Sequence, residues 1–206
     1  MSGIFNLDNG FFSFMSKLTD CILVSVLWII CCIPVVTVGA ATTALYYTIH
    51  KAVHEDRGYV FREYMHSFKD NFKQSTIAWL ILLVVGVFLG SDAYLTYQLK
   101  QHGDAVGNVF YLVILLLLVE LIIWIYLFPY VSRFDDTLKT VFRNSFFIGF
   151  SNPLKTVGML LTGLVIGYLV YLLPFLILIA PALYMLGIEQ LMERIYHRFI
   201  PEEETE

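Results

Sequence analysis

Long apolar runs alternate along this chain with short segments that hold most of its charged residues. An α-helix needs about 20 predominantly apolar residues to cross the hydrocarbon core of a bilayer, and it satisfies every backbone N–H and C=O group within the segment. Three runs meet this length: residues 18–38, 77–95 and 109–131. The pattern predicts an all-α fold, a polytopic transmembrane helical bundle forming a single transmembrane domain over residues 1–206.

The last apolar run, residues 157–188, is too long for one ordinary span at about 1.5 Å per residue. It contains Pro174 and Pro181. We divide it into spans 156–173 and 174–192, so that Pro174 opens a helix at its first position, where its missing N–H costs nothing. This gives five spans. The alternative is one long, kinked helix and four spans in all.

Lysine and arginine indicate the orientation, because short loops rich in these residues stay in the cytoplasm. The connection between the second and third spans has only Lys100. The segments after the first and third spans are basic, with Lys51, Arg57, Arg62, Lys69 and Lys73 in one and Arg133, Lys139, Arg143 and Lys155 in the other. We therefore expect the N-terminus outside, and five spans then place Arg194 and Arg198 inside.

Both basic segments, residues 50–74 and 133–152, have the periodicity of amphipathic helices. Apolar residues recur at spacings of three and four in each, namely Phe61, Tyr64, Met65, Phe68 and Phe72 in the first and Phe134, Leu138, Val141 and Phe142, with Ser145, in the second. We expect them at the cytoplasmic face, either on the lipid headgroups or docked in a soluble subunit. Residues 1–17 are expected to lie at the membrane interface, and residues 200–206 form a solvated acidic tail.

The two halves of the chain share a weak pattern. Each has a span with a central tryptophan and a proline near its cytoplasmic end, Trp28 with Pro34 and Trp124 with Pro129. Farther along, Phe68, Phe72 and Lys73 align with Phe150, Leu154 and Lys155 at a constant offset. The second and fourth spans each contain a pair of glycines four residues apart, Gly86 with Gly90 and Gly163 with Gly167, a spacing that permits close helix approach. The pattern suggests a repeat of two hairpins, and chance similarity of helical hairpins is the alternative.

Composition agrees with a membrane protein and argues against several function classes. The 206 residues are 58% hydrophobic and 15% charged, whereas soluble domains carry about a quarter charged residues. A net charge of -4 offers no basic surface for nucleic acid. Three cysteines in the first apolar run are expected to pack as small hydrophobes. Phosphate-binding loops and nucleophile turns are absent from the sequence, so we expect no enzyme, no cofactor and no metal.

Glu120 is the ionisable residue that most needs an explanation, since a carboxylate in mid-span is costly and faces protein or a water-filled cavity. It is either a proton or substrate site or a structural residue that joins helices, with Thr162, Tyr168 or Tyr171 as partners.

The stretch from Pro34 to Ala44 contains small and hydroxylated residues where the first span meets the cytoplasm. Hydroxyl groups there can bond to carbonyls that Pro34 frees. The stretch is either a contact surface for a partner or an internal packing seam with a kink. Its candidate residues are Pro34, Thr37, Gly39, Thr42 and Thr43, and those of the following basic segment are Arg62, Phe68, Phe72 and Lys73.

His50 and His54 have the i,i+4 spacing that can clamp a metal ion, with Glu55 beside them. The sequence shows no matching pattern of further ligands, and lysine and arginine flank the pair. We therefore expect a solvated helix face here.

The segments Phe5–Asn9 and Leu27–Tyr46, the second with its proline, threonine, glycine and alanine pattern, carry a family signature. Together with Phe61, Phe68, Asn71, Phe72 and Lys73, they resemble the YesL-like family of bacterial membrane proteins, a domain of unknown function. The resemblance implies no activity. It implies a genetic neighbourhood of oligosaccharide importers of the ATP-binding-cassette (ABC) type and of enzymes that degrade plant polysaccharides.

These observations lead to two functional expectations. The first is a non-enzymatic accessory subunit or partner of an ABC-type oligosaccharide importer, multi-pass in the bacterial plasma membrane and in contact with the permease subunits. The alternative is a small independent transporter or channel that works as a homo-oligomer. The oligomeric state itself stays open.

Overall fold

The computed structural model describes residues 10–55, 58–102 and 105–196, and every regular element among them is helical. The long helices are α1 (Gly10–Cys32), α4 (Phe72–Gln101), α5 (Val109–Arg133), α7 (Pro153–Leu172) and α8 (Ala180–Tyr196). Shorter helices are α2 (Val38–Thr48), α3 (Val60–Asp70) and α6 (Leu138–Ser151). Single turns η1 (Val35–Thr37), η2 (Ile49–His54), η3 (Ala105–Asn108) and η4 (Pro174–Leu178) join them. The all-α prediction is confirmed.

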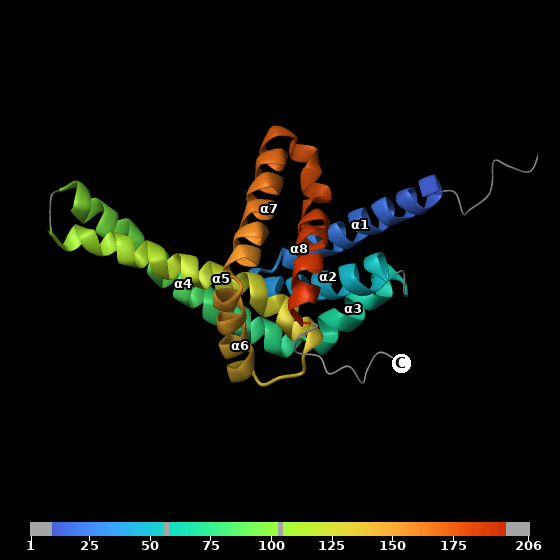
Figure 1. The fold of residues 1–206 in the computed structure, drawn as a ribbon, viewed down its shortest axis with the longest axis horizontal. Helices are drawn as coiled ribbons and strands as arrows, with labels where there is room; N and C mark the ends of the chain where they lie inside the picture. The colour runs from blue at the N-terminus through green and yellow to red at the C-terminus, as the bar shows by residue number, and fades with distance from the viewer. Residues whose placement is uncertain (1–9, 56–57, 103–104, 197–206) are drawn as a thin grey trace, which may run out of the picture.

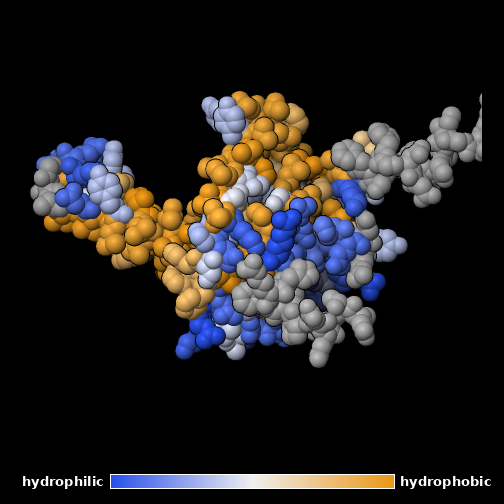
Figure 2. Space-filling view, viewed as in Figure 1, coloured by the Kyte–Doolittle hydropathy of each residue, from blue (hydrophilic) through white to orange (hydrophobic). Residues whose placement is uncertain are grey.

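Three arms diverge from one compact region, which we call the hub (Figure 1). The arms are α1, the α4–α5 hairpin and the α7–α8 hairpin, and the hub consists of α2, α3, α6 and the arm ends that meet them. Figure 2 shows apolar surface along the α7–α8 hairpin and along the α4–α5 hairpin up to its hydrophilic tip, and hydrophilic surface on the lower part of the hub. This distribution is compatible with a membrane protein.

Four helical segments are long and apolar enough to cross a membrane by length and composition: Met15–Cys32, Phe72–Gln101, Val106–Arg133 and Pro153–Leu172. The fifth predicted span, residues 174–192, differs from them. Pro174 opens only the turn η4, and the helix that follows, α8, has 17 residues and buries two carboxylates, Glu189 and Glu193. It packs back along α7, so the last apolar run is a hairpin rather than one kinked helix.

The predicted first span, residues 18–38, begins inside α1 but extends past the end of that helix, because α1 runs from Gly10 to Cys32. Proline lacks an N–H and disfavours helical geometry in the residue before it, so Pro34 ends the helix. The Thr37 hydroxyl donates to the Pro34 carbonyl at 2.7 Å and also to the Cys31 carbonyl. The predicted interfacial segment lies within α1 from Gly10 onward. Its first nine residues and the acidic tail lie outside the described residues.

After this break, α2 turns into the hub and becomes its most buried helix. Nine of its eleven residues are buried, from Gly39 through Tyr46 and then Thr48. Gly39 allows the closest approach, since a Cβ there would lie 2.4 Å from the Ser75 carbonyl oxygen and 2.6 Å from Trp79 Cβ. The Thr43 and Ser75 hydroxyls share a hydrogen bond of 2.9 Å at the same contact.

The two amphipathic helices pack into the hub. The inner face of α3 consists of Val60, Tyr64 and Ser67, whereas Phe61 and Phe72 are exposed, so the predicted apolar face was partly wrong. Val60, Tyr64 and Ser67 follow one another at i, i+4 and i+7 and form one stripe of the helix, and α3 packs against α2. In α6, Val141 and Ser145 of the predicted face are buried.

One local feature occurs in both halves of the chain, whereas others differ. Each amphipathic helix passes into a long helix at an asparagine, Asn71 or Asn152, whose side-chain amide donates to the carbonyl four residues earlier at 3.1 Å. The prolines differ, because Pro34 ends a helix whereas Pro129 lies inside α5. No counterpart of α2 follows α5 among the described residues.

The Gly39→Ala change tests the close contact between α2 and α4. The added methyl group collides with backbone and side-chain atoms of α4, and such overpacking costs about 1–3 kcal/mol. We expect a lower thermal midpoint for the detergent-purified protein. The matched control is Gly90→Ala, where no atom lies within 4 Å of a built Cβ. Equal midpoints for the two variants would contradict the contact.

Candidate functional site

A cluster of ionisable side chains lies inside the hub, where the turn η2 faces α8. His50 comes from η2, and Glu189 and Glu193 come from successive turns of α8. All three are buried. His50 Nδ1 lies 2.7 Å from Glu189 Oε1 and 3.8 Å from Glu193 Oε1. One ligand atom from each residue falls within 4.8 Å of the others, so these three side chains could hold a metal ion.

Two further side chains, those of Arg133 and Tyr46, donate hydrogen bonds to the Glu193 carboxylate. Arg133, at the end of α5, donates from Nη2 to Glu193 Oε2 at 3.1 Å. Tyr46, on α2, donates its hydroxyl to Glu193 Oε1 at 2.9 Å. Burial raises the pKa of Tyr46 well above its ordinary value, so its hydroxyl stays protonated and remains a donor.

The rim of the cluster carries a second histidine and a third carboxylate. His54 stacks on His50 with ring centroids 6.3 Å apart, and its Nδ1 lies 3.5 Å from Glu189 Oε2. The other ring nitrogen of His50, Nε2, lies 3.4 Å from Glu55 Oε1. His54 and Glu55 are more exposed than His50, which gives the cluster an opening to solvent.

The backbone conformation of residues 49–54 helps to explain why His50 and His54 both contact Glu189. Residues 49–54 form a π-helical turn that continues α2. Such turns are rare and occur often at functional sites.

The expectation of a solvated face at His50 was wrong, because α8 covers it. Two functional residues, Glu189 and Glu193, were missed. Their own i,i+4 spacing was the available signal, since it matches the spacing of His50 and His54 on the opposite segment.

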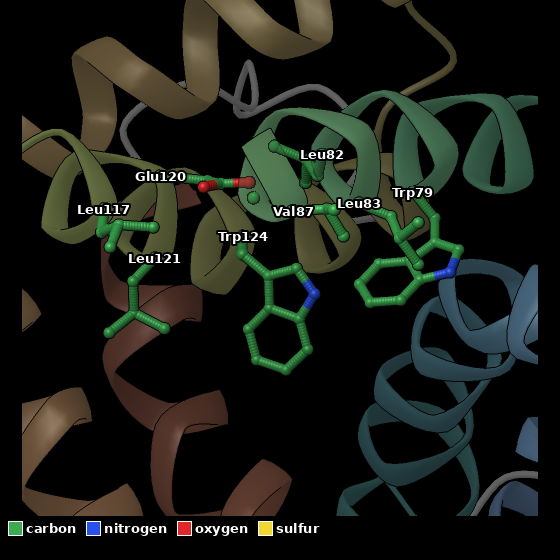
Figure 3. Close-up of a pocket in the computed structure, with 9 residues that line it drawn as sticks. Trp79, Leu82, Leu83, Val87, Leu117, Glu120, Leu121 and Trp124 are labelled. Atoms are coloured by element: carbon green, nitrogen blue, oxygen red, sulfur yellow. The ribbon is translucent and has the colours of Figure 1, made fainter. Parts of the chain in front are cut away.

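Glu120 lies in a separate groove of about 380 Å³ between α4 and α5. Figure 3 shows its carboxylate directed from α5 toward α4, with Trp79 and Trp124 farther along the groove. A Cβ on Gly86 would lie 2.9 Å from Glu120 Oε1, so this glycine makes room for the carboxylate.

The other predicted contacts of this region are not found. No hydrogen bond links Glu120 to Thr162, Tyr168 or Tyr171 within the described part of the chain, and the Thr162 hydroxyl donates to Gly158 instead. Gly90 and Gly167 have no atom within 4 Å of a built Cβ, so they mark no close helix approach inside one copy.

The remaining candidate residues fall into two groups. In the Pro34–Ala44 stretch, residues 39–44 form an internal packing surface, whereas residues 34–36 are exposed. Thr42 accepts a hydrogen bond from Trp28 Nε1 at 3.2 Å, and the buried Thr43 pairs with Ser75. In the basic segment, Phe68 packs against the core, while Arg62, Phe72 and Lys73 are exposed.

Comparison with known proteins supports the family resemblance. A family model described as "Protein of unknown function, DUF624" matches residues 21–93. The "Uncharacterized protein YesL" of Bacillus subtilis (strain 168) is 29% identical over 160 residues, which are 76% of this chain and 74% of that protein. The chain is therefore similar to the YesL-like DUF624 family, as its sequence pattern predicts. No solved structure matches it.

The DUF624 match covers only part of the cluster. Residues 21–93 run from α1 to α4 and contain Tyr46, His50, His54 and Glu55, but Arg133, Glu189 and Glu193 lie beyond them. The family description therefore assigns no role to the assembled site.

An Arg133→Met change tests the ionic side of the cluster. It leaves the buried Glu193 without its cation, and breaking a buried pair in this way costs about 3–5 kcal/mol. We expect a clear fall in the thermal midpoint of the purified protein. Lys139→Met, an exposed cation on α6, is the control and should change little. Comparable midpoints for both variants would mean that the pair is unimportant.

Proposed function

We propose that this protein is a non-enzymatic accessory subunit of an ABC-type oligosaccharide importer in the bacterial plasma membrane. The observation that carries the proposal is the outer face of α3, an exposed surface of mixed chemistry on a firmly anchored helix.

The inner side of α3 is fixed in the hub. Tyr64 is fully buried and donates its hydroxyl to the Ala41 carbonyl at 3.3 Å. Glu63 pairs with Lys51 at 2.9 Å. These contacts hold the helix in one orientation, so its outer face is a preorganised surface, which lowers the entropic cost of binding a partner.

The outer side offers apolar and charged groups together. A shallow groove of about 400 Å³ is lined by Phe61, Arg62, Met65, His66, Lys69 and Asp70. Tyr59 and Phe61 are 80% and 60% exposed. Aromatic side chains and arginine are the residues that contribute most to protein interfaces.

The charges favour a protein over lipid headgroups. Anionic lipid attracts clusters of several lysines and arginines. The groove instead combines Arg62 and Lys69 with Asp70, and His66 Nδ1 pairs with Asp70 at 2.8 Å. Both signs of charge on one face suit a partner with a complementary pattern. The choice of an importer permease as that partner rests on the genetic neighbourhood that the family resemblance implies.

The test is extraction of a tagged full-length copy from its native host grown on a complex polysaccharide, with identification of all co-purifying proteins. We expect importer permease subunits in near-equal amounts. The pair Phe61→Ala and Arg62→Ala should lower their recovery at least about tenfold, as expected for interface hot spots.

The control for this experiment is Phe88→Ala, since Phe88 is 66% exposed on the α4 arm, away from the hub. It should leave recovery unchanged. Absence of importer subunits from the wild-type preparation, or equal recovery with the α3 variants, would refute the proposal.

A second candidate function is an independent homo-oligomeric transporter. The half-buried Glu120 carboxylate in an apolar groove within the span is the observation that favours it.

The Glu120→Gln change separates the two candidates. In vesicles that contain the purified protein and a pH-sensitive dye, a transporter that moves protons should lose most of its flux with this variant, while assembly stays intact. Tyr94→Phe, at an exposed position on the same arm, is the control. Equal flux from wild type and Glu120→Gln would remove this candidate.

A further inference from the structure

We propose that the His50, His54, Glu189 and Glu193 side chains form a binding site for a divalent transition-metal ion, with Zn²⁺ as the representative ion. The inference is independent of the importer partnership, because it concerns the inside of the hub rather than its outer face.

The ligand set suits such an ion. Imidazole nitrogen and carboxylate oxygen bind Zn²⁺ at about 2.0–2.2 Å, and four such ligands form a tetrahedron with edges of roughly 3.3 Å. The distances from His50 Nδ1 to the two glutamates, 2.7 and 3.8 Å, bracket that edge. His54 Nδ1 lies 3.5 Å from Glu189 Oε2, outside this group of three, and its side chain would have to turn toward the ion to supply a fourth ligand.

The i,i+4 spacing places two candidate ligands on each of two facing helical segments. His50 and His54 project from successive turns of one helical segment, and Glu189 and Glu193 do the same on α8. Residues at i and i+4 lie on one face of a helix. The two imidazole rings stack with an interplanar angle of 10°. His50 contacts both carboxylates, and His54 contacts Glu189. Four ligands from two facing helical segments form the kind of site that helical bundles build in their interiors.

The surrounding groups are those that support metal ligands. A histidine that binds a metal through one ring nitrogen usually donates its other N–H to a carboxylate. Glu55 lies 3.4 Å from His50 Nε2, the nitrogen that faces away from Glu189. Arg133 and the protonated Tyr46 hydroxyl hold Glu193 in the same supporting way. The arrangement sets His50 to present Nδ1 to an ion.

The charge count also favours a cation. The buried Glu189 and Glu193 contribute two negative charges and Arg133 one positive charge, so one negative charge remains when both imidazoles are neutral. Buried charge is costly unless it is paired or bound to a metal. A bound cation would offset this charge. A protonated imidazole would do so as well, and the experiment below distinguishes these outcomes.

Two buried polar atoms beside Glu193 give an independent observation. The Tyr196 hydroxyl and Arg133 Nε have no hydrogen-bond partner among the described residues. Tyr196 is fully buried, and its pKa is raised by burial and also by the nearby charge of Glu193. An ordered water molecule beside Glu193 would give these two donors a partner.

The test uses the full-length protein in detergent, stripped with a chelator and titrated with Zn²⁺. Bound metal is measured by mass spectrometry, and the visible absorption of Co²⁺ reports four-coordinate geometry. We expect one ion per chain, a tetrahedral Co²⁺ spectrum and a higher thermal midpoint with Zn²⁺. Affinity should fall more than about 100-fold in Glu189→Gln, and about 10–100-fold in Glu55→Gln, the loss typical of outer-shell partners.

The matched control is His66→Gln, an exposed histidine that pairs with Asp70 on α3, which should bind Zn²⁺ like the wild type. His54→Gln covers the case in which Glu189→Gln does not fold, because this side chain is half exposed and its loss should weaken binding without unfolding the protein. Wild-type protein without saturable Zn²⁺ would overturn the proposal and favour protonated histidines. Equal binding by wild type, Glu189→Gln and His54→Gln would overturn it as well.

Discussion

The arrangement of the whole chain depends on the end of α1 at Pro34. Without that break, the first apolar run would continue as one straight helix, and the small residues from Gly39 to Ala44 would extend it instead of entering the hub. The missing N–H of Pro34 and the hydroxyl of Thr37 together turn the backbone into α2. Since α2 contacts α1, α3, α4, α5 and α8, this one turn decides which faces of the other helices meet.

The pattern of apolar residues predicted the structure best in the segments whose composition is suited to contact with lipid. Apolar length identified the spans, and the proline in the last run predicted the hairpin of α7 and α8. The same reasoning misplaced the end of the first span, because apolar residues continue past Cys32 while the helix does not. Hydropathy measures whether a segment prefers lipid or water. It does not describe how a proline changes the backbone conformation.

The site was harder to predict for a related physical reason. His50 and His54 are separated from Glu189 and Glu193 by well over a hundred residues, and only the packing of α8 against η2 brings them together. A charged segment beside a membrane span is ordinarily solvated. The presence of Lys51 and Arg57 in the sequence therefore favoured a solvated segment. Glu120 could be identified because a carboxylate within an apolar run is conspicuous. Gly86 makes room for the Glu120 carboxylate only because of the register between α4 and α5. That register cannot be deduced from the sequence of either helix alone.

The divergence of the arms has a consequence for how the protein sits in its solvent. The α4–α5 arm stands apart from α7, and both present apolar side chains such as Val84 and Leu164 to the space around them. In a bilayer, acyl chains would fill the space between the arms and pack against these side chains, in the place that other helices take in a closed bundle. The hub differs from the arms in this respect, because it is held by its own buried contacts.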